Sequence, residues 1–495
     1  MKIIKLFLPF FLVALLFASC GKSDYADVVP KDASLVIEVN MADIASKGGI
    51  AESKLLASVK TNLDYIASGD DKAKLVEIFD NPENTGIDFT VPVYAFTASG
   101  SFGVAARLSD ETAFEDFITL LSNQGFAVQP SERDGVKWVS LLDELDMVYK
   151  DDVLLITMPL DPEGSAGNKR NASNWITQDK SEECFSSTDH YKRMQETDGD
   201  VVAYFDVDDY AGKLKSMMFK DMRDAEVSAV ASLSFEDGCA KMKTSIFSND
   251  EKVNNAIAEY GKNLRKIGGQ YIDTPMEDFM AWFGCNVDGN WLLPILKSDK
   301  DIKTLMFMIE RGIDIEKIIK SVDGDMAIVV PKMNPADESE TGFDFIATAQ
   351  LKNSDFLSDV DGWTKSMKDY GLSMLRTGKN QYELLTADGK INWGVDDNEL
   401  YFATENAYKL NAFSGRSALL KDYADKIKDS RMYLYVNLES LPMVELSQLM
   451  GLGHEYAFIF ANMKALTFSM NEASEFEVNL ALKNPKENFL KQIFN

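Results

Sequence analysis

The stretch Asp32-Ala33-Ser34-Leu35-Val36-Ile37-Glu38-Val39-Asn40-Met41-Ala42-Asp43-Ile44 contains the pattern on which the predicted fold rests. Its first part is rich in β-branched and other apolar residues, which is typical of a strand. Asn40 follows as a helix N-cap, and Asp43 stands three residues later, where it can return a contact to the cap. The stretch therefore predicts a strand that leads directly into a helix.

The same strand-to-helix pattern recurs twice later in the chain. Residues 200–210 and 431–441 each have the pattern of a strand, then Val-Asp or Val-Asn, then a helix. Further stretches match in pairs: 86–89 with 312–315, 149–154 with 394–400, and 232–238 with 467–473. These pairs lie roughly 235 residues apart, and self-similarity at a nearly fixed offset is the sequence signature of a duplicated unit.

We therefore predict an α+β fold made of two tandem related halves, residues 31–260 and 261–495. Strands occur in hairpin-like runs flanked by helices, so the sheets should be largely antiparallel. A strict alternation of strand and helix is missing from the sequence, which argues against a Rossmann or barrel fold. Two stretches, 159–168 and 332–341, are rich in turn-forming and polar residues and are expected to be exposed loops.

The first 19 residues have the features of a targeting segment. A positively charged start and an apolar run, Leu6–Phe17, lead through two small residues to Cys20. The run is too short to span a bilayer, and a small-residue site that ends on Cys resembles the bacterial lipoprotein signal. We predict cleavage before Cys20, acylation of this residue and a polar tether over residues 20–30. The alternative is an ordinary secretory peptide in which Cys20 is incidental.

Together with this signal, the stretch Pro30–Leu35 has a Pro-x-Asp-Ala-x-Leu-like form at the start of the first strand. In these features and in its length of 495 residues, the chain resembles a family of uncharacterised Bacteroides-type lipoproteins. The resemblance implies a location in the cell envelope, at the outer membrane, with a fatty acid such as palmitate on Cys20. Either a periplasmic or a surface-facing orientation is compatible with it, and it implies no enzymatic activity.

The composition is strongly acidic. The chain has 79 Asp and Glu against 51 Lys and Arg, which gives a net charge of −28 at pH 7. Such an excess repels phosphate backbones, so nucleic acid is excluded as an expected partner. A hydrophobic content of 45% supports substantial cores, and the length exceeds what one core usually fills. No stretch after the leader has the roughly 18 apolar residues of a membrane-spanning helix.

Three cysteines remain besides Cys20, namely Cys184, Cys239 and Cys285. They are widely spaced and contain no Cys-x-x-Cys pair, so neither a zinc ribbon nor a disulfide scaffold is expected. At most one disulfide could form among them. We predict that all three are buried, inert thiols.

Residues that would carry chemistry are sparse. The two histidines, His190 and His454, stand outside any nucleophile-elbow or zinc-protease motif, so no catalytic residue, metal ligand or cofactor site is predicted. Asp206 and Asp208 alternate along a predicted strand and could in principle bind calcium. The capping interpretation is preferred, because the matching positions elsewhere hold Asn.

Aromatic residues give the candidate ligand contacts. Trp282 and Trp291 lie in a stretch interrupted by glycines and a proline, and on a loop they could stack on a sugar ring or contact a partner. Packing between the two halves explains them as well. Trp175, near the polar stretch of the first half, is the candidate for an exposed recognition residue.

The leading functional hypothesis is a membrane-anchored envelope lipoprotein with a non-enzymatic binding or structural role. Its partner would be an envelope protein, a peptide or a glycan. The alternative is an Asp/Glu-dependent envelope hydrolase with its site between the two halves, which would need two carboxylates about 5–10 Å apart in a concave pocket.

Overall fold

The structure is a computed structural model. It describes residues 24–494 except 64–66, 68, 143–144, 162–163, 179–183, 211, 213–224, 274–278, 299, 301–302, 304–305, 308–312, 332–343, 370–372, 387–388, 414–418 and 442–460. The leader, Cys20, His454 and the predicted loop 332–341 therefore lie outside the described residues.

The chain forms two compact units that differ from a simple division of the sequence. Unit 1 comprises residues 1–210, 228–244 and 484–495, and unit 2 comprises residues 211–227 and 245–483. The predicted halves meet at residue 260. Three segments, 211–227, 245–260 and 484–495, thus belong to the unit formed mainly by the opposite half of the sequence.

The sheet of unit 1 is built around β1 (Leu35–Val39), which pairs antiparallel with β3 (Val93–Ala98) along one edge and with β9 (Val201–Asp206) along the other. Beyond β9 lies β10 (Ser228–Glu236). Beyond β3 follow, in order, β4 (Ser101–Leu108), β8 (Val153–Pro159), β7 (Leu145–Lys150), β6 (Val136–Leu141) and β5 (Ser131–Arg133). All these pairings are antiparallel.

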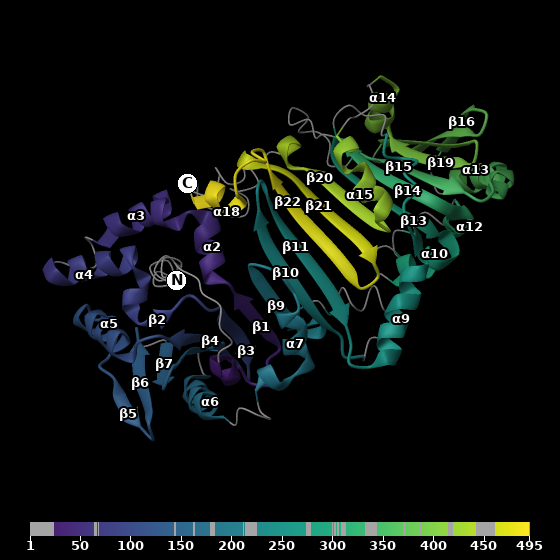
Figure 1. Ribbon diagram of the computed structural model, residues 1–495. Coiled ribbons are helices and arrows are strands. Elements are labelled where there is room, and N and C mark those ends of the chain that lie inside the picture. The colour runs from purple at the N-terminus through teal and green to yellow at the C-terminus, as the bar shows by residue number, and fades with distance from the viewer. Residues whose placement is uncertain are drawn as a thin grey trace. The chain divides into compact units, whose positions relative to one another are not determined.

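The sheet of unit 2 has the same strand order around β13 (Phe279–Asp288), which pairs with β14 (Val322–Pro331) and β20 (Met432–Asn437). Beyond β20 lie β21 (Met463–Glu472) and β22 (Glu475–Leu482). Beyond β14 follow β15 (Ile346–Leu351), β19 (Glu399–Thr404), β18 (Gly389–Asp396), β17 (Gln381–Thr386) and β16 (Ser373–Gly378). The prediction of two tandem related α+β halves with antiparallel sheets is confirmed (Figure 1).

The stretch quoted first folds as its pattern predicts. Helix α2 (Met41–Gly48) starts directly after β1, and the Asn40 side-chain oxygen accepts a hydrogen bond of 3.2 Å from the Asp43 amide. The Asn40 amide group donates to the Asp43 carboxylate at 2.8 Å. The first bond satisfies one of the backbone N–H groups that the start of a helix otherwise leaves without partners, and the second joins the two side chains. The cap therefore fixes the point at which the chain leaves the sheet.

Different helices pack on the two faces of the unit 1 sheet. Helices α2 and α5 (Glu111–Asn123) pack on one face, where they bury a core with β4, β6, β7 and β8. The opposite face is covered by α6 (Ser165–Thr177) and α7 (Asp189–Gln195). Part of the predicted exposed loop 159–168 is therefore the start of α6. In unit 2, both faces of the sheet contribute to buried cores.

The predicted tether is shorter than residues 20–30. Asp24–Val28 forms the 3-10 helix η1, and Tyr25 is 1% exposed. The Tyr25 hydroxyl donates to the carbonyl of Pro92, and Pro30 forms a β-bridge with Cys184. Residues 24–30 are thus an integral part of unit 1, because their apolar side chains are needed to complete its core.

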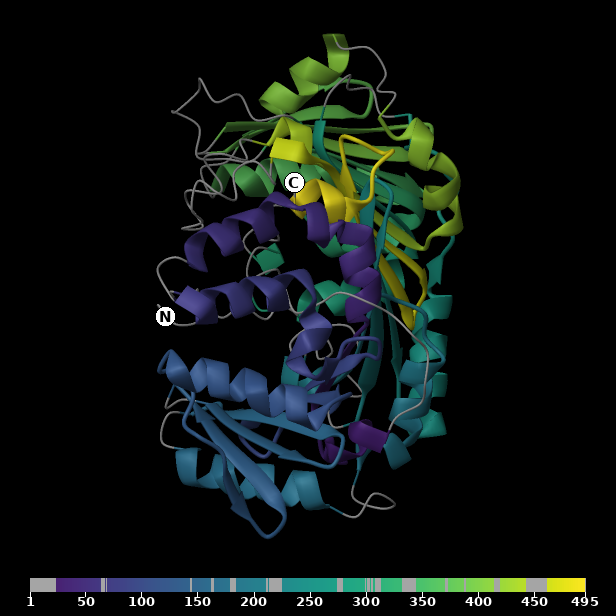
Figure 2. The ribbon, with the colours of Figure 1, turned by 60° about the vertical axis from the view of Figure 1, so that its left-hand side comes forward.

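Helix α18 (Phe489–Phe494), at the C-terminus, completes unit 1. Its segment packs on the turn that joins β10 to β11 (Cys239–Phe247), where the Gly238 amide donates to the Glu487 carbonyl at 2.8 Å. The ring of Phe235 stacks on that of Phe489 with their centroids 5.9 Å apart. Helix α18 lies beside α2, and the turned view of Figure 2 shows the same neighbours.

Helix α9 (Glu251–Lys262) occupies the position in unit 2 that α18 occupies in unit 1. It follows β11 in the sequence but packs on Ala473, in the turn between β21 and β22. A Cβ atom at Gly261 would lie 2.6 Å from the Ala473 Cβ, so the helix and the turn are in close contact. Each unit is therefore completed by the helix that ends the opposite half of the sequence.

Replacing Phe494 tests the contribution of the C-terminal helix to unit 1. The Phe494 ring is partly buried against the core formed by α2 and α5, and it lies so close to Gly48 that a Cβ there would be 2.6 Å away. We expect Phe494→Ala to lower the free energy of unfolding by about 2 kcal/mol, less than for a fully buried Phe. Urea unfolding measures this. Lys486→Ala, on the exposed part of the same segment, should leave the value unchanged; equal effects of both changes would contradict the packing role.

Candidate functional site

The three tryptophans proposed as ligand contacts lie within packed regions. Trp175 on α6 is 5% exposed, and its ring meets that of Phe96 edge-on at 5.2 Å, so the expectation of an exposed recognition residue is wrong. Trp282 on β13 is 1% exposed and donates its ring N–H to the Tyr271 carbonyl at 3.1 Å. Trp291, on α10 (Gly289–Ser298), is partly buried with its ring edge-on to Tyr260 at 4.9 Å.

Two polar residues considered in the sequence, Asp206 and His190, make contacts that stabilise the fold. Asp206, at the end of β9, accepts hydrogen bonds from the hydroxyls of Tyr204 at 2.9 Å and Ser228 at 3.3 Å. Asp208 is exposed on the following helical turn, so the two carboxylates do not share one face of a strand. His190 on α7 stacks on Tyr204 with their ring centroids 4.7 Å apart. Burial lowers the pKa of His190, with Asp206 opposing that effect.

A cluster of tyrosines and one carboxylate lies beneath α7. Glu38 on β1 accepts a hydrogen bond from the Gln195 side chain at 2.6 Å and another from the Tyr94 hydroxyl. Tyr94 and Tyr191 bring their hydroxyls to 3.4 Å. Burial raises the pKa of the Glu38 carboxyl above its usual range although these two hydrogen bonds lower it. Burial likewise raises the pKa values of Tyr94 and Tyr191.

The buried carboxylate of unit 2 holds backbone in place. Asp325 on β14 is 2% exposed and accepts from the amides of Gly268 at 2.8 Å, Gly269 at 2.8 Å and Gln270 at 3.1 Å. The Asn286 side chain donates to the same carboxylate at 2.8 Å. Four such bonds compensate for the loss of water around a buried charge. Asp325 thus ties the loop after β12 (Leu264–Arg265) to the sheet.

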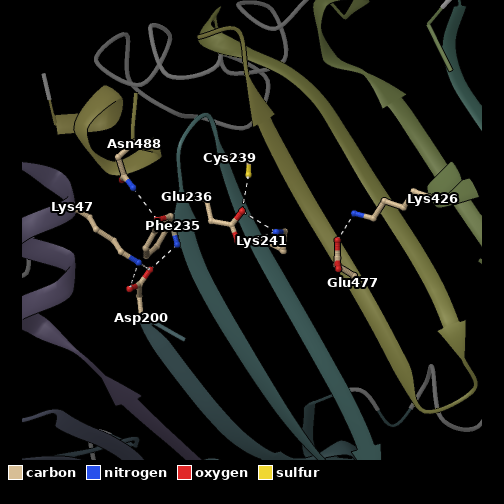
Figure 3. A network of polar contacts seen from close by, with 9 residues as sticks. All are labelled: Lys47, Asp200, Phe235, Glu236, Cys239, Lys241, Lys426, Glu477 and Asn488. Atoms are coloured by element: carbon tan, nitrogen blue, oxygen red, sulfur yellow. Dashed lines mark hydrogen bonds and ion pairs between the residues drawn. The ribbon is translucent and has the colours of Figure 1, made fainter. Parts of the chain in front are cut away.

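Asp200 has a comparable role in unit 1 (Figure 3). Its carboxylate is 3% exposed and pairs with the Lys47 ammonium at 2.6 Å. It also accepts from the Phe235 amide at 2.7 Å, while the Phe235 carbonyl accepts from the Asn488 side chain at 2.9 Å. This chain of contacts joins α2, β10 and the C-terminal segment, so the charge pair supports the docking of α18.

A cavity of about 410 Å³ lies in unit 2 where α9 packs on the turn between β21 and β22. Its lining residues are Ile246, Asn254, Ile257, Ala258, Gly261, Lys262, Arg431, Glu472, Ala473 and Ser474. Glu472 is the one carboxylate in this lining, and it pairs with Arg431 at 2.8 Å. Arg431 also donates to the carbonyls of Gly261, Leu264 and Asn471. The cavity therefore lacks the two carboxylates that a glycosidase-type mechanism needs.

The three described cysteines are free thiols. Cys184 and Cys285 are buried as predicted, whereas Cys239 is partly exposed at the start of β11 and lies 3.8 Å from the Glu236 carboxylate. Burial and the neighbouring Asp325 raise the pKa of Cys285 to about 12. Cys285 is therefore a neutral thiol at physiological pH and a poor nucleophile.

The most unusual surface of unit 1 is an apolar face of its sheet, which we call the open face. It consists of partly exposed residues on five neighbouring strands: Leu35, Ile37, Ala95, Phe102, Ala203, Phe205, Ala231 and Leu233. The pairing of Ile37 with Ala95 and Ala203, and of Ala203 with Ala231, places them side by side on one face. The residues that alternate with them are buried under α6 and α7, for example Val36 and Phe96.

The open face lies on the same side of the sheet as α2 and α5, beside the core that these helices bury. Val39 and Val93 continue this face by pairing and pack against that core. A part of a sheet face that leaves such a core normally carries polar residues. Here, the residues with charged side chains on the central strands, Glu38, Arg107 and Asp206, belong to the opposite face. The open face continues to Met158, which pairs with Phe102 and is 37% exposed.

Unit 2 repeats this arrangement position by position. Ala281 and Phe283 on β13 correspond by pairing to Leu35 and Ile37, and they are likewise partly exposed. Their neighbours on the same face are apolar and partly exposed: Ile328, Val330, Leu434, Val436, Leu466 and Phe468. Phe283 and Phe468 also pack against a buried core of unit 2, so this face is partly covered. Sequence reasoning missed both surfaces, because a strand that is apolar on both sides carries no signal for how much of each side the helices cover.

Within the described residues, no group of three or more His, Cys, Asp or Glu side chains could hold a metal ion. No helix in this part of the chain has the length and apolar character needed to cross a membrane.

The model of a family described as a domain of unknown function, DUF4836, matches residues 25–490. The chain belongs to the DUF4836 family. The expectation of a long domain without an assigned function is thus confirmed, whereas Bacteroides-type lipoprotein status stays a prediction. No curated protein matches the chain.

Among solved structures, crystal forms of TP0453 are similar to part of this DUF4836 member. Form I has 12% sequence identity and a TM-score of 0.27, and the match covers 49% of this chain and 87% of that chain. Form III gives 12%, 0.27, 49% and 88%, and form IV gives 13%, 0.27, 46% and 81% for the same quantities.

The raised pKa of Glu38 predicts how stability depends on pH. The folded state holds the Glu38 proton more tightly than the unfolded chain, so this residue makes stability fall as pH rises through and above the ordinary Glu pKa. Glu38→Gln should therefore raise the urea midpoint at pH 7 and leave it nearly unchanged at about pH 3, where Glu is almost fully protonated in both states. The exposed Glu52→Gln is the matched control. A lower midpoint for Glu38→Gln at pH 7 would show that the carboxylate is stabilising instead.

Proposed function

We propose that this protein is a non-enzymatic binding protein of the cell envelope that is anchored through an acylated Cys20 and holds a partner on its open face. The observation that carries the proposal is the open face itself. Partly exposed apolar side chains occupy the same face of five adjacent strands in unit 1. Monomeric proteins rarely leave a contiguous apolar surface of this kind uncovered, and such surfaces mark binding sites.

The chemistry of the open face favours a protein or peptide partner over a glycan. Thr97 is the polar residue that shares this face with Leu35 and Phe102. A sugar brings many hydroxyl groups that lose hydrogen bonds to water when they are buried against apolar side chains. An apolar protein surface loses none, and it gains about 25 cal/mol for each Å² removed from water.

The polar groups of the described residues support a non-enzymatic role. Asp200 and Asp325 are held by ammonium, amide or backbone N–H donors that stabilise the fold. The cavity in unit 2 has one carboxylate, and an arginine neutralises it. Catalytic acids and bases normally face a cavity with a pKa adjusted for proton transfer. The hydrolase alternative is not favoured by any observation on these groups.

The location is part of the proposal. The leader that ends at Cys20 and the acidic composition support a protein held at the outer membrane by its N-terminus. Acyl chains on one residue provide about 0.8 kcal/mol for each buried methylene, so several chains give stable anchoring.

Acylation is tested by metabolic labelling with an alkyne fatty acid in the native host. We expect label on the wild-type chain and none on Cys20→Ala, which should run as a larger, uncleaved precursor. Cys239→Ala is the matched control, because Cys239 is the partly exposed thiol among the described residues. Equal labelling of Cys20→Ala and the wild type would contradict the anchor.

The open face is tested with Nile red, a neutral dye whose fluorescence rises on apolar surfaces. Ile37→Thr and Phe102→Thr introduce threonine, a β-branched residue that suits strands, and place hydroxyls on the open face. We expect the double variant to lose at least about half of the fluorescence enhancement, because its apolar surface is interrupted. Val128→Ser changes an apolar side chain that is 57% exposed elsewhere in unit 1 and should have no effect. Unchanged fluorescence in the double variant would show that the open face does not bind apolar molecules.

A further inference from the structure

We infer that the partner of the open face of unit 1 is an amphipathic α-helix with an apolar stripe flanked by Lys or Arg. The inference rests on the proposed binding function and names the chemistry of the partner. Three features of the described residues support it: the shape of the surface, its lack of charge, and the charges next to it.

The surface has dimensions that suit a helix. Neighbouring strands lie about 4.8 Å apart, so the five strands of the open face extend roughly 20–25 Å across the sheet. A helix with its side chains is about 10 Å wide and packs well on a sheet through one apolar stripe. An extended peptide would need a free strand edge instead, but β1 and β9 are paired along both edges.

The residues that form the open face carry no charged side chain. Leu35, Ile37, Ala203 and Phe205 are apolar and lie side by side. A carboxylate or phosphate buried against them would lose its water without gaining a hydrogen bond. The part of the partner that touches the open face must therefore be apolar, and its charges must lie beside this face.

The charges at one end of the open face are mainly acidic. Asp32 is exposed before β1, and Asp208 and Asp209 are exposed after β9, next to the ends of the strands that carry Leu35 and Phe205. Lys31 is the basic residue in the same segments. The whole chain carries a net charge of −28, which adds a field of the same sign. Charge complementarity thus favours a cationic partner and disfavours anionic lipids.

Hydroxyl groups lie at the same end of the open face. The Tyr210 side chain is 50% exposed, and its ring meets that of Phe205 edge-on at 6.2 Å. Its hydroxyl lies 2.9 Å from that of Thr97 and 3.5 Å from that of Ser34. An exposed aromatic ring beside acidic residues can contact a Lys or Arg on the flank of a bound helix through its π face.

The test uses the mature chain with Cys20→Ala and a fluorescent peptide of about 18 Leu and Lys residues, roughly five helical turns, with Leu at helical spacing. Fluorescence anisotropy should show binding that weakens with added salt. A peptide of the same composition with scrambled order, and one with Glu in place of Lys, should each bind at least about tenfold more weakly. The Ile37→Thr/Phe102→Thr variant should lose binding to a similar extent, whereas Val128→Ser should keep it.

The outcomes separate the inference from the proposed function. Equal binding of the ordered and scrambled peptides, or of the double variant and the wild type, overturns the inference. If zwitterionic phosphatidylcholine vesicles bind instead, and the double variant loses that binding, the occupant is a lipid surface and the open face still functions in binding. If neither the peptide nor the vesicles bind in a way that depends on the open face, the inference and the proposed function both fail. Far-UV circular dichroism and urea midpoints show that the variants are folded.

Discussion

The pairing of one short strand along both of its edges is the constraint on which each unit depends. In unit 1, β1 joins β3 to β9, which lies much further along the sequence. In unit 2, β13 joins β14 to β20 in the same way. Because side chains alternate across a strand, the register of this central strand decides, in unit 1, which residues pack under α6 and α7 and which lie on the side that carries the open face. The Asn40 cap, which ends β1, fixes where that strand stops.

The exchange of the last helices has a consequence for how the chain folds. Unit 1 contains residues 484–495, so its core is incomplete until the entire chain has been synthesised. Phe489 and Phe494 are then added to a surface that α2, Phe235 and Asp200 have already prepared. The duplication explains why this arrangement works: α9 and α18 follow equivalent hairpins, and each finds an equivalent turn in the other unit, at Ala473 and Gly238. A repeat with two equivalent docking positions permits the exchange without a new kind of contact.

The sequence predicted the fold well where local signals and the duplication agreed. Asn40 and Asp43 identified the start of α2, and the Asp151-Asp152 and Asp397-Asn398 turns identified equivalent hairpins, where positive φ angles suit Asp and Asn. Residues 276–296 were interpreted as an interrupted aromatic stretch, because glycine is unusual within a strand. In the structure, Gly284 lies in β13 beneath the Trp282 ring, where a Cβ would be 2.2 Å from the ring. The sequence neighbours of Trp175 are polar, which predicts an exposed side chain. In the structure, Trp175 lies on the side of α6 that faces the sheet, and its ring contacts that of Phe96. Contacts of this kind join residues far apart in the sequence, so composition alone does not reveal them.

The buried helix η1 limits how far Cys20 can lie from the body of unit 1. Four residue steps separate Cys20 from Asp24, and a fully extended chain covers at most about 14 Å over that length. With Cys20 acylated as proposed, unit 1 is held near the lipid headgroups, which occupy roughly 5–7 Å on each side of the hydrocarbon layer. A body with this negative charge is repelled by anionic headgroups within a Debye length of about 8–10 Å. Under the proposed anchoring, the burial of Tyr25 would make the lipid composition of the bilayer a determinant of where the protein can reside.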